Sequence, residues 1–244
     1  MTKQERAVRT RLALIRSAAE QFEARGYVGA SLAEISAGAG VSSGALHFHF
    51  ANKAAVAEAV EHAAEQALRE AAARHRDGDG DGSALQRLVD VTHHVARLLC
   101  ADVVVRAGLR LNAEQVGGQV AGRVRDLRRE WRECVQGLLA EAERGGELAT
   151  GVTPQRTSAV VLAATTGIEV LAREDDGWLA RPSLTDLWQL LLPCLATPCL
   201  AGTLDPAGSE AAGSDLVGVE GAGSGSAEPG VQAEAGGRVG LALR

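Results

Sequence analysis

The stretch ASLAEISAGAGVSSGALHFHF, residues 30–50, contains the two helix starts and the turn that decide the fold of this chain. Ser31 and Glu34 have the S-x-x-E spacing of a capping box, which predicts that a short helix begins after Ser31. Gly40 can take the left-handed conformation that a tight turn needs, and Ser42 then caps another short helix. Two short helices joined by a glycine-containing turn are typical of a helix-turn-helix unit.

A longer amphipathic helix precedes this unit. The segment VRTRLALIRSAAEQFEARGY, residues 8–27, repeats apolar side chains at helical spacing. Gly26 is expected to end the helix. The side chains expected to face the core are those of Leu12, Ile15, Ala19 and Phe22.

Helical patterns continue through the rest of the chain. Residues 119–144 carry one apolar stripe, with arginines and glutamates expected on the solvent face. Thr153 is expected to cap the next helix and Pro154 to begin it. That helix is apolar almost all round over 159–172, and Ser183 is expected to cap a last helix. With abundant alanine and few aromatic residues, the sequence predicts an all-α fold.

The composition divides the chain into four parts. These are a helix-turn-helix domain at 1–52, a connecting helix at 53–76, a larger helical domain at 77–202 and a tail at 203–244. The tail has no apolar period and is expected to be disordered, because it cannot bury enough surface to offset its ordering entropy. The two apolar C-terminal helices need a further partner, which predicts a homodimer.

Charge is distributed unevenly along the chain. The formal net charge is −6, yet residues 1–53 carry seven basic and four acidic side chains. Residues 202–244 carry six acidic side chains and two arginines. The N-terminal part is therefore where a polyanion is expected to bind.

The sequence contains no constellation that points to catalysis or metal binding. P-loop and H-E-x-x-H motifs are absent, so no enzyme and no cofactor are expected. The DGDGDG run at 77–82 starts like a calcium loop, but its twelfth position is Leu88 and not glutamate. The four cysteines lack C-x-x-C spacing and are expected to be buried, reduced thiols of a cytoplasmic protein. The uncharged run at 187–204 contains two prolines and is expected to be an interface helix, not a membrane span.

Several short motifs together resemble a known family. In the first domain they are Gly26-Tyr27, Ala33-Glu34-Ile35, Ala39-Gly40-Val41, Gly44-Ala45-Leu46, Phe48-His49-Phe50 and Lys53. This pattern resembles the DNA-binding domain of TetR-type repressors. Further on they are RAGLRLNAEQ at 106–115, Trp131, GELATGV at 146–152, TTGIEVL at 165–171 and DLWQLLLP at 186–193. These segments resemble the γ-butyrolactone receptors that govern antibiotic production in filamentous actinobacteria.

The resemblance implies that the helix from Ser42 to Phe50 enters the major groove of DNA. The residues that it assigns to DNA contacts are Ser31, Ser42, Ser43, Gly44, His47, Phe48, His49 and Lys53. Among them, Ser31 and Lys53 are expected on phosphates, and the serines at 31 and 42 also cap helices. For Phe48 and Phe50, packing in the core is the more ordinary role.

Two departures from this resemblance concern the DNA contacts. Such receptors more commonly have Thr-Lys where this chain has Ser42-Ser43, and Tyr where it has His47. Loss of a lysine removes one phosphate contact, and with it affinity and salt dependence. A histidine can replace that charge only when it is protonated, so DNA binding is expected to favour mildly acid pH.

The resemblance also places a small-molecule pocket among the middle helices, with Trp131 over the ligand. The residues expected to line it are Leu109, Trp131, Val135, Thr165 and Thr166. The apolar stripe directs Trp131 inward, where the alternative role is in the core. A hydroxyl at 165 or 166 can meet a ligand or bond to the carbonyl four residues earlier.

These implications describe a dimeric transcriptional repressor without a cofactor. It would bind a double-stranded DNA operator, leave it when a γ-butyrolactone-like effector binds, and control secondary-metabolite genes. The connecting helix would transmit the movement between the domains. One alternative is a pseudo-receptor that answers to antibiotics or to no lactone. Another is a helical carrier or enzyme whose helix-turn-helix is incidental.

Overall fold

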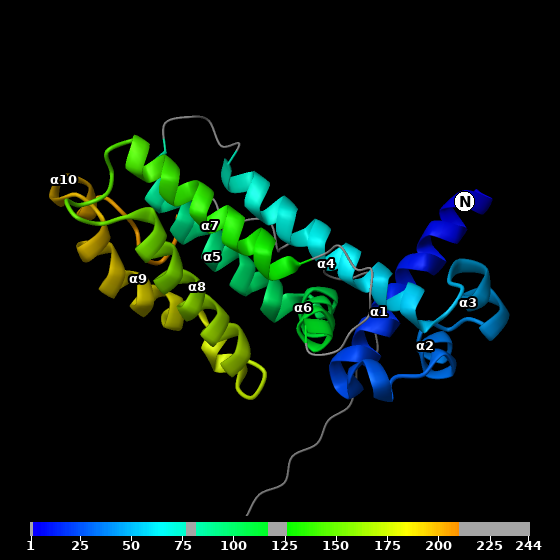
Figure 1. Ribbon diagram of the computed structural model, residues 1–244. Helices are drawn as coiled ribbons and strands as arrows, with labels where there is room; N and C mark the ends of the chain where they lie inside the picture. Colours follow the sequence, from blue (N-terminus) through cyan, green and yellow to red (C-terminus); the bar gives the residue numbers. More distant parts are fainter. Residues whose placement is uncertain (1, 77–81, 117–125, 210–244) are drawn as a thin grey trace, which may run out of the picture.

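The computed structural model describes residues 2–76, 82–116 and 126–209. The helices in these ranges are α1 (Lys3–Gly29), α2 (Leu32–Gly38), α3 (Ser43–His49), α4 (Lys53–Arg76), α5 (Ala84–Ala101), α6 (Val103–Val116), α7 (Leu127–Arg144), α8 (Pro154–Leu171), the 3₁₀ helix η1 (Asp176–Leu179), α9 (Arg181–Leu195) and α10 (Pro198–Ala201). The all-α prediction is thus confirmed. Figure 1 shows α1 to α3 at one end of the molecule, α5 and α7 to α10 towards the other, and α4 running between them.

The N-terminal unit begins and ends its helices where the capping pattern predicts. The Ser31 hydroxyl accepts the Glu34 N–H at 3.2 Å, and the Ser42 hydroxyl accepts the Ala45 N–H at 3.2 Å. Between α2 and α3, Gly40 has a φ of 67°, which is the left-handed conformation expected of it. The two short helices therefore meet through the predicted turn.

The buried face of α1 differs from the prediction at one residue. Ile15, Ala19 and Phe22 are buried as expected, but the Leu12 side chain is 59 % exposed, so its assignment to the core was wrong. Successive residues of a helix are about 100° apart, and the inward position falls to Leu14 instead. Gly26, with a φ of 69°, interrupts the helix but does not end it as predicted, because α1 continues to Gly29.

Helix α6 joins this unit to the rest of the molecule. Its Ala107 and Leu111 belong to the buried core beneath α1, and its length also packs along α4. Where α6 crosses α4, a methyl group at Gly108 would overlap the Ala64 side chain and lie 3.5 Å from the Val60 carbonyl oxygen. The absence of a side chain at position 108 sets how near the two helices lie.

The remaining helices surround a second buried core formed mainly by α5, α7, α8 and α9. Trp188 of α9 is fully buried there, and its indole N–H donates to the Thr92 hydroxyl at 2.8 Å. Because the buried indole has a partner, the largest side chain of this core leaves no polar group unsatisfied.

The helix starts in this half are only partly as predicted. α8 begins at Pro154, although the Thr153 side chain makes no capping hydrogen bond. The prediction that Ser183 caps the last helix was wrong, because α9 already begins at Arg181, with Pro182 in its first turn. The described part of α7 begins at Leu127, and the earlier part of the expected stripe lies outside the described residues.

The first residues after α10 pack against α5. Both carboxylate oxygens of buried Asp90 accept hydrogen bonds of 2.7 Å from the Ser209 backbone N–H and hydroxyl. The Gln86 amide exchanges two hydrogen bonds with the Asp205 backbone, and Leu204 is buried. The expectation of a disordered tail from 203 is corrected for residues 203–209, because these polar contacts hold them in place. Residues 210–244 and the acidic segment at 77–81 lie outside the described residues.

The cysteines and the membrane prediction can also be assessed. None of the four cysteines, all within the described residues, forms a disulfide, but Cys100, Cys194 and Cys199 are exposed, so their expected burial was wrong. They lie on the outward faces of their helices. Among the helices in the described ranges, none is long and apolar enough to cross a bilayer.

We expect Gly108→Ala to destabilise the protein by about 1–3 kcal/mol, because the added methyl group must push α6 away from α4. Chemical unfolding by urea measures this change. The control is Gly137→Ala, since a methyl group there meets no atom within 4 Å on the exposed face of α7. The control should raise stability by up to about 1 kcal/mol. Equal effects of the two substitutions would contradict the close crossing.

Candidate functional site

The outer face of α3 is built from side chains that the core does not use. Ser43, Gly44 and His47 are exposed. Phe48 is 83 % exposed, whereas Phe50 is buried. The expected core role is thus correct for Phe50 and wrong for Phe48. Since Leu46 and Phe50 are one helical turn apart and both face inward, the side chains at 47 and 48 must point outward.

Two residues expected to bind phosphate have partners within the protein. The Ser31 hydroxyl donates to the Glu34 carboxylate at 2.8 Å, and Arg25 forms an ion pair with the same carboxylate. The hydrogen bonds from Ser31 and then Arg25 lower the pKa of Glu34. The Lys53 ammonium donates to the Val28 carbonyl at 3.0 Å, beside the Tyr27 ring. DNA contacts by Ser31 and Lys53 stay a prediction, as does the contact by the half-buried His49.

A cavity of about 480 Å³ lies between α4, α5, α6, α7 and α8 and is called the chamber below. Leu109, Trp131, Thr165 and Thr166, four of the five residues expected to line a pocket, do line it. Val135 does not, so its assignment to the pocket is corrected. It lies one turn beyond Trp131 on α7, where it is fully buried in the second core.

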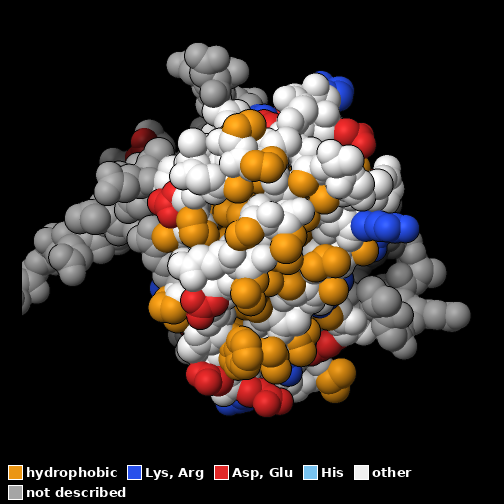
Figure 2. Space-filling view, turned by 90° about the vertical axis from the view of Figure 1, so that its left-hand side faces the viewer, with side chains coloured by type: hydrophobic (Ala, Val, Ile, Leu, Met, Phe, Trp, Pro, Cys, Tyr) orange, Lys and Arg blue, Asp and Glu red, His pale blue; other side chains and the backbone are white. Residues whose placement is uncertain are grey.

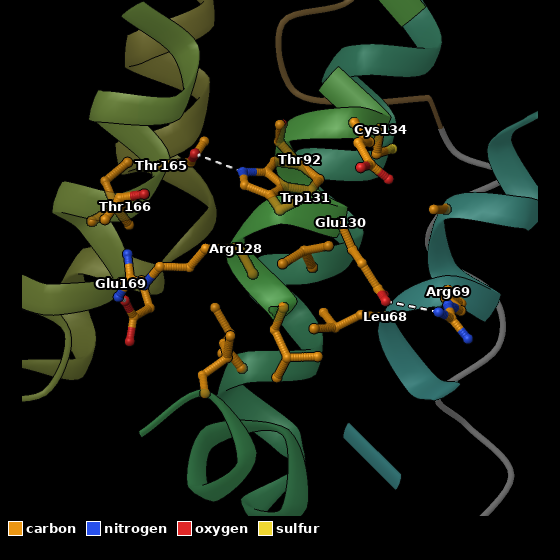
Figure 3. A pocket seen from close by; sticks show the side chains of 18 of the residues that line it. Leu68, Arg69, Thr92, Arg128, Glu130, Trp131, Cys134, Thr165, Thr166 and Glu169 are labelled. Atoms are coloured by element: carbon orange, nitrogen blue, oxygen red, sulfur yellow. Dashed lines mark hydrogen bonds and ion pairs between the residues drawn. The ribbon is translucent and has the colours of Figure 1, made fainter. Parts of the chain in front are cut away.

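Trp131 and Thr165 form one hydrogen-bonded pair in the chamber wall, as Figure 3 shows. The indole N–H of Trp131 donates to the Thr165 hydroxyl at 3.0 Å, and that hydroxyl donates to the Val161 carbonyl at 2.9 Å. The bond to the carbonyl four residues earlier is one of the two outcomes expected for this threonine. The pair fixes the orientation of the indole.

Thr166 differs from its neighbour. It lines the chamber, but its hydroxyl has no hydrogen-bond partner among the described residues. A hydroxyl group can donate one hydrogen bond and accept two. Of the neighbouring threonines at 165 and 166, the one at 166 is therefore available to a bound molecule.

Charged side chains stand on both sides of Trp131, and sequence reasoning missed them. Arg128 and Glu169 form an ion pair of 3.1 Å beside α8, while Glu130 and Arg69 form one of 2.7 Å beside α4 (Figure 3). Positions 128 and 130 belong to a segment that was expected to face solvent. They line the chamber because Arg128 lies one turn before Trp131 and Glu130 directly precedes it, so both flank the inward-pointing indole.

The acidic side of the chamber has a perturbed ionisation. Glu65 of α4 is buried and shares the Arg69 guanidinium with Glu130. Burial raises the pKa of Glu130, its hydrogen bond with Arg69 opposes the rise, and Glu65 adds to it. Two carboxylates, Glu65 of α4 and Glu130 of α7, thus surround one arginine, and of the two only Glu130 lines the chamber.

An exposed helix of a helix-turn-helix unit, joined to a domain with an internal chamber, is the arrangement of a ligand-responsive DNA-binding regulator. Residues 14–60 match the family of bacterial regulatory proteins, tetR family. Residues 82–197 match the tetracyclin repressor-like C-terminal domain. The chain belongs to the tetR family of bacterial regulatory proteins.

Individual relatives narrow the comparison. The chain is 31 % identical over 212 residues to the A-factor receptor protein of Streptomyces griseus, covering 85 % of this chain and 71 % of the relative. A crystal structure of a γ-butyrolactone receptor, an ArpA-like protein, is 30 % identical with a TM-score of 0.68, covering 83 % of this chain and 95 % of the other. The CprB protein of Streptomyces coelicolor in complex with its operator is 32 % identical with a TM-score of 0.65, covering 81 % and 94 %.

We expect Thr165→Val to lower stability by about 1–2 kcal/mol, because the Trp131 N–H loses its acceptor. Thermal unfolding followed by tryptophan fluorescence measures this change. Thr166→Val is the matched control and should leave stability nearly unchanged, since its hydroxyl has no partner among the described residues. If both variants unfolded together, Thr165 would not be the residue that holds the indole.

Proposed function

We propose that this chain is a dimeric transcriptional repressor that binds operator DNA and is released by a small molecule of γ-butyrolactone type. The observation that carries the proposal is the exposed face of α3. It presents Ser43, Gly44, His47 and Phe48 to solvent on a unit whose own core is complete without them. The role is one of binding, not catalysis, and it places the protein in the cytoplasm with the DNA.

The chemistry of that face suits the major groove. Gly44 lets the helix approach the DNA closely, and the apolar ring of Phe48 can contact the methyl group of thymine. Ser43 and His47 can form hydrogen bonds with bases or phosphates. A structure of CprB with its operator shows that a similar chain binds DNA.

Effector release requires that the chamber and α3 move together, and the contacts of α6 connect them. The Arg106 guanidinium of α6 forms an ion pair with Glu23 of α1, and Arg110 donates to the Glu23 backbone carbonyl. The Tyr27 N–H donates to Glu114 at 3.3 Å. A ligand that binds one arrangement of these helices better than the other shifts the population by that difference alone.

A dimer would place two copies of α3 on one operator. The face of α8 and α9 exposes Val160, Val170, Leu171 and Leu190, the last of them 75 % exposed. Figure 2 shows hydrophobic side chains gathered on the end of the molecule that these helices form. Such a contiguous apolar face marks an association surface, and a second copy with the same face would cover it.

Two variants test the proposal reciprocally. Phe48→Ala should weaken binding to the promoter upstream of its own gene by about tenfold and leave effector binding unchanged. Trp131→Ala should bind the same DNA as the unaltered protein but need about tenfold more γ-butyrolactone for release. Fluorescence anisotropy of a labelled duplex, with random-sequence competitor, measures both. DNA binding indifferent to lactones would favour a pseudo-receptor, and no preference for any nearby promoter would favour a carrier or enzyme.

Leu190→Arg should shift the protein from dimer to monomer, because a charge would be buried in the apolar interface. Sedimentation velocity measures the change. Leu12→Arg is the control, since this leucine is also exposed but lies on α1. A dimer unaffected by the change at 190 would exclude the α8 and α9 face as the interface.

A further inference from the structure

Arg128 lies in the chamber wall with a carboxylate partner that a second arginine also holds. Its Nη2 atom contacts the Oε2 atom of Glu169 at 3.1 Å. On the other oxygen of that carboxylate, Arg173 contributes two N–H groups, from Nε at 3.1 Å and Nη2 at 2.6 Å. Glu169 is thus paired twice, and Arg128 is the arginine of the two that lines the chamber.

This arrangement leaves positive charge at the α8 side of the chamber. Arg173 by itself neutralises Glu169, so Arg128 can turn towards a second anion without leaving a carboxylate unpaired. A guanidinium has five N–H donors in a planar fork, which matches a carboxylate in geometry. On the side towards α4, Glu130 of α7 lines the chamber and shares Arg69 with Glu65, which lies outside the lining. Two carboxylates around one arginine leave negative charge there, which would repel an anion. The chamber is therefore polarised, with its basic side at α8 (Figure 3).

The wall between these polar sides is apolar. Val95 and Leu99 of α5, Leu109 of α6, Ile168 of α8 and Leu184 of α9 line it. Such a surface buries an alkyl chain favourably, since each methylene removed from water adds to the hydrophobic stabilisation. The chamber thus combines a hydrocarbon surface with a cation that can be released from its partner.

We propose that the effector carries a carboxylate on an apolar chain, and that Arg128 binds the carboxylate. The proposal rests on the repressor function proposed above, because it assumes that the chamber holds the effector, and it differs from that function in making a carboxylate, not the closed lactone, the tighter effector. Two sources share this chemistry: the ring-opened hydroxy acid of a γ-butyrolactone and a medium-chain fatty acid. Arg128 selects either of them over the neutral closed lactone.

Isothermal titration of the full chain at pH 7.5 with three probes tests the proposal. The probes are a 2-alkanoyl-γ-butyrolactone, the hydroxy acid made from it by alkaline hydrolysis, and decanoate. We expect at least one carboxylate to bind more tightly than the lactone. Comparison of the hydroxy acid with decanoate then shows whether the ring-opened lactone or a fatty acid is the preferred ligand. Arg128→Gln should weaken binding of that carboxylate by about tenfold or more and leave binding of the lactone unchanged. Arg132→Gln, an exposed arginine of α7 outside the chamber, is the control.

Two further substitutions give effects of opposite sign that a general loss of structure would not produce. Arg173 does not line the chamber, yet Arg173→Gln should weaken binding of the carboxylate probe. Arg128 would then be the remaining arginine paired with Glu169 and less able to turn towards the probe. Glu169→Gln should strengthen binding of the carboxylate probe, because Arg128 then has no carboxylate partner at position 169. Tighter binding of the lactone, or no change in Arg128→Gln, overturns the proposal and leaves the repressor function standing. The proposal is also overturned if none of the probes binds. DNA binding by the same sample then tests the proposed repressor function separately.

Discussion

The structure depends on the close crossing of α4 and α6 at Gly108 and Ala64. Only a residue without a side chain lets α6 lie against α4 at this distance. From that position α6 supplies Ala107 to the core of the N-terminal unit and Leu109 to the chamber wall. One helix thereby belongs to both halves of the molecule, and its placement cannot change in one half without changing in the other.

Polar contacts also connect α6 to the end of α1. Arg106 and Arg110 of α6 hold Glu23, just before the interruption of α1 at Gly26, and Glu114 accepts the N–H of Tyr27. These contacts lie at the base of the helix-turn-helix unit. A small displacement of α6 by a molecule in the chamber would therefore act on the end of α1 through ion pairs and a backbone hydrogen bond, not through packing alone.

Helix α7 shows where sequence reasoning about the candidate site succeeded and failed. The apolar period correctly turned Trp131 inward, but it placed Val135 beside a ligand when neighbouring helices cover it. It also assigned Arg128 and Glu130 to solvent. A period describes one helix in isolation, whereas the chamber wall is defined by the residues that α4, α5, α6 and α8 place opposite α7. The charged residues were found only once those neighbours were in place.

Local signals in the sequence determined the helix-turn-helix unit: the caps at Ser31 and Ser42, the left-handed glycine at 40 and the spacing of large side chains. Each acts within a few residues, so its effect does not depend on the rest of the chain. Tertiary structure alone decided that Phe48 is exposed, that Asp90 holds residues 203–209, and that Glu169 is shared by two arginines. The contacts of Asp90 with Ser209 and of Arg128 with Glu169 join segments far apart in the chain, so no local pattern contains them, and the exposure of Phe48 depends on which neighbours the fold leaves uncovered.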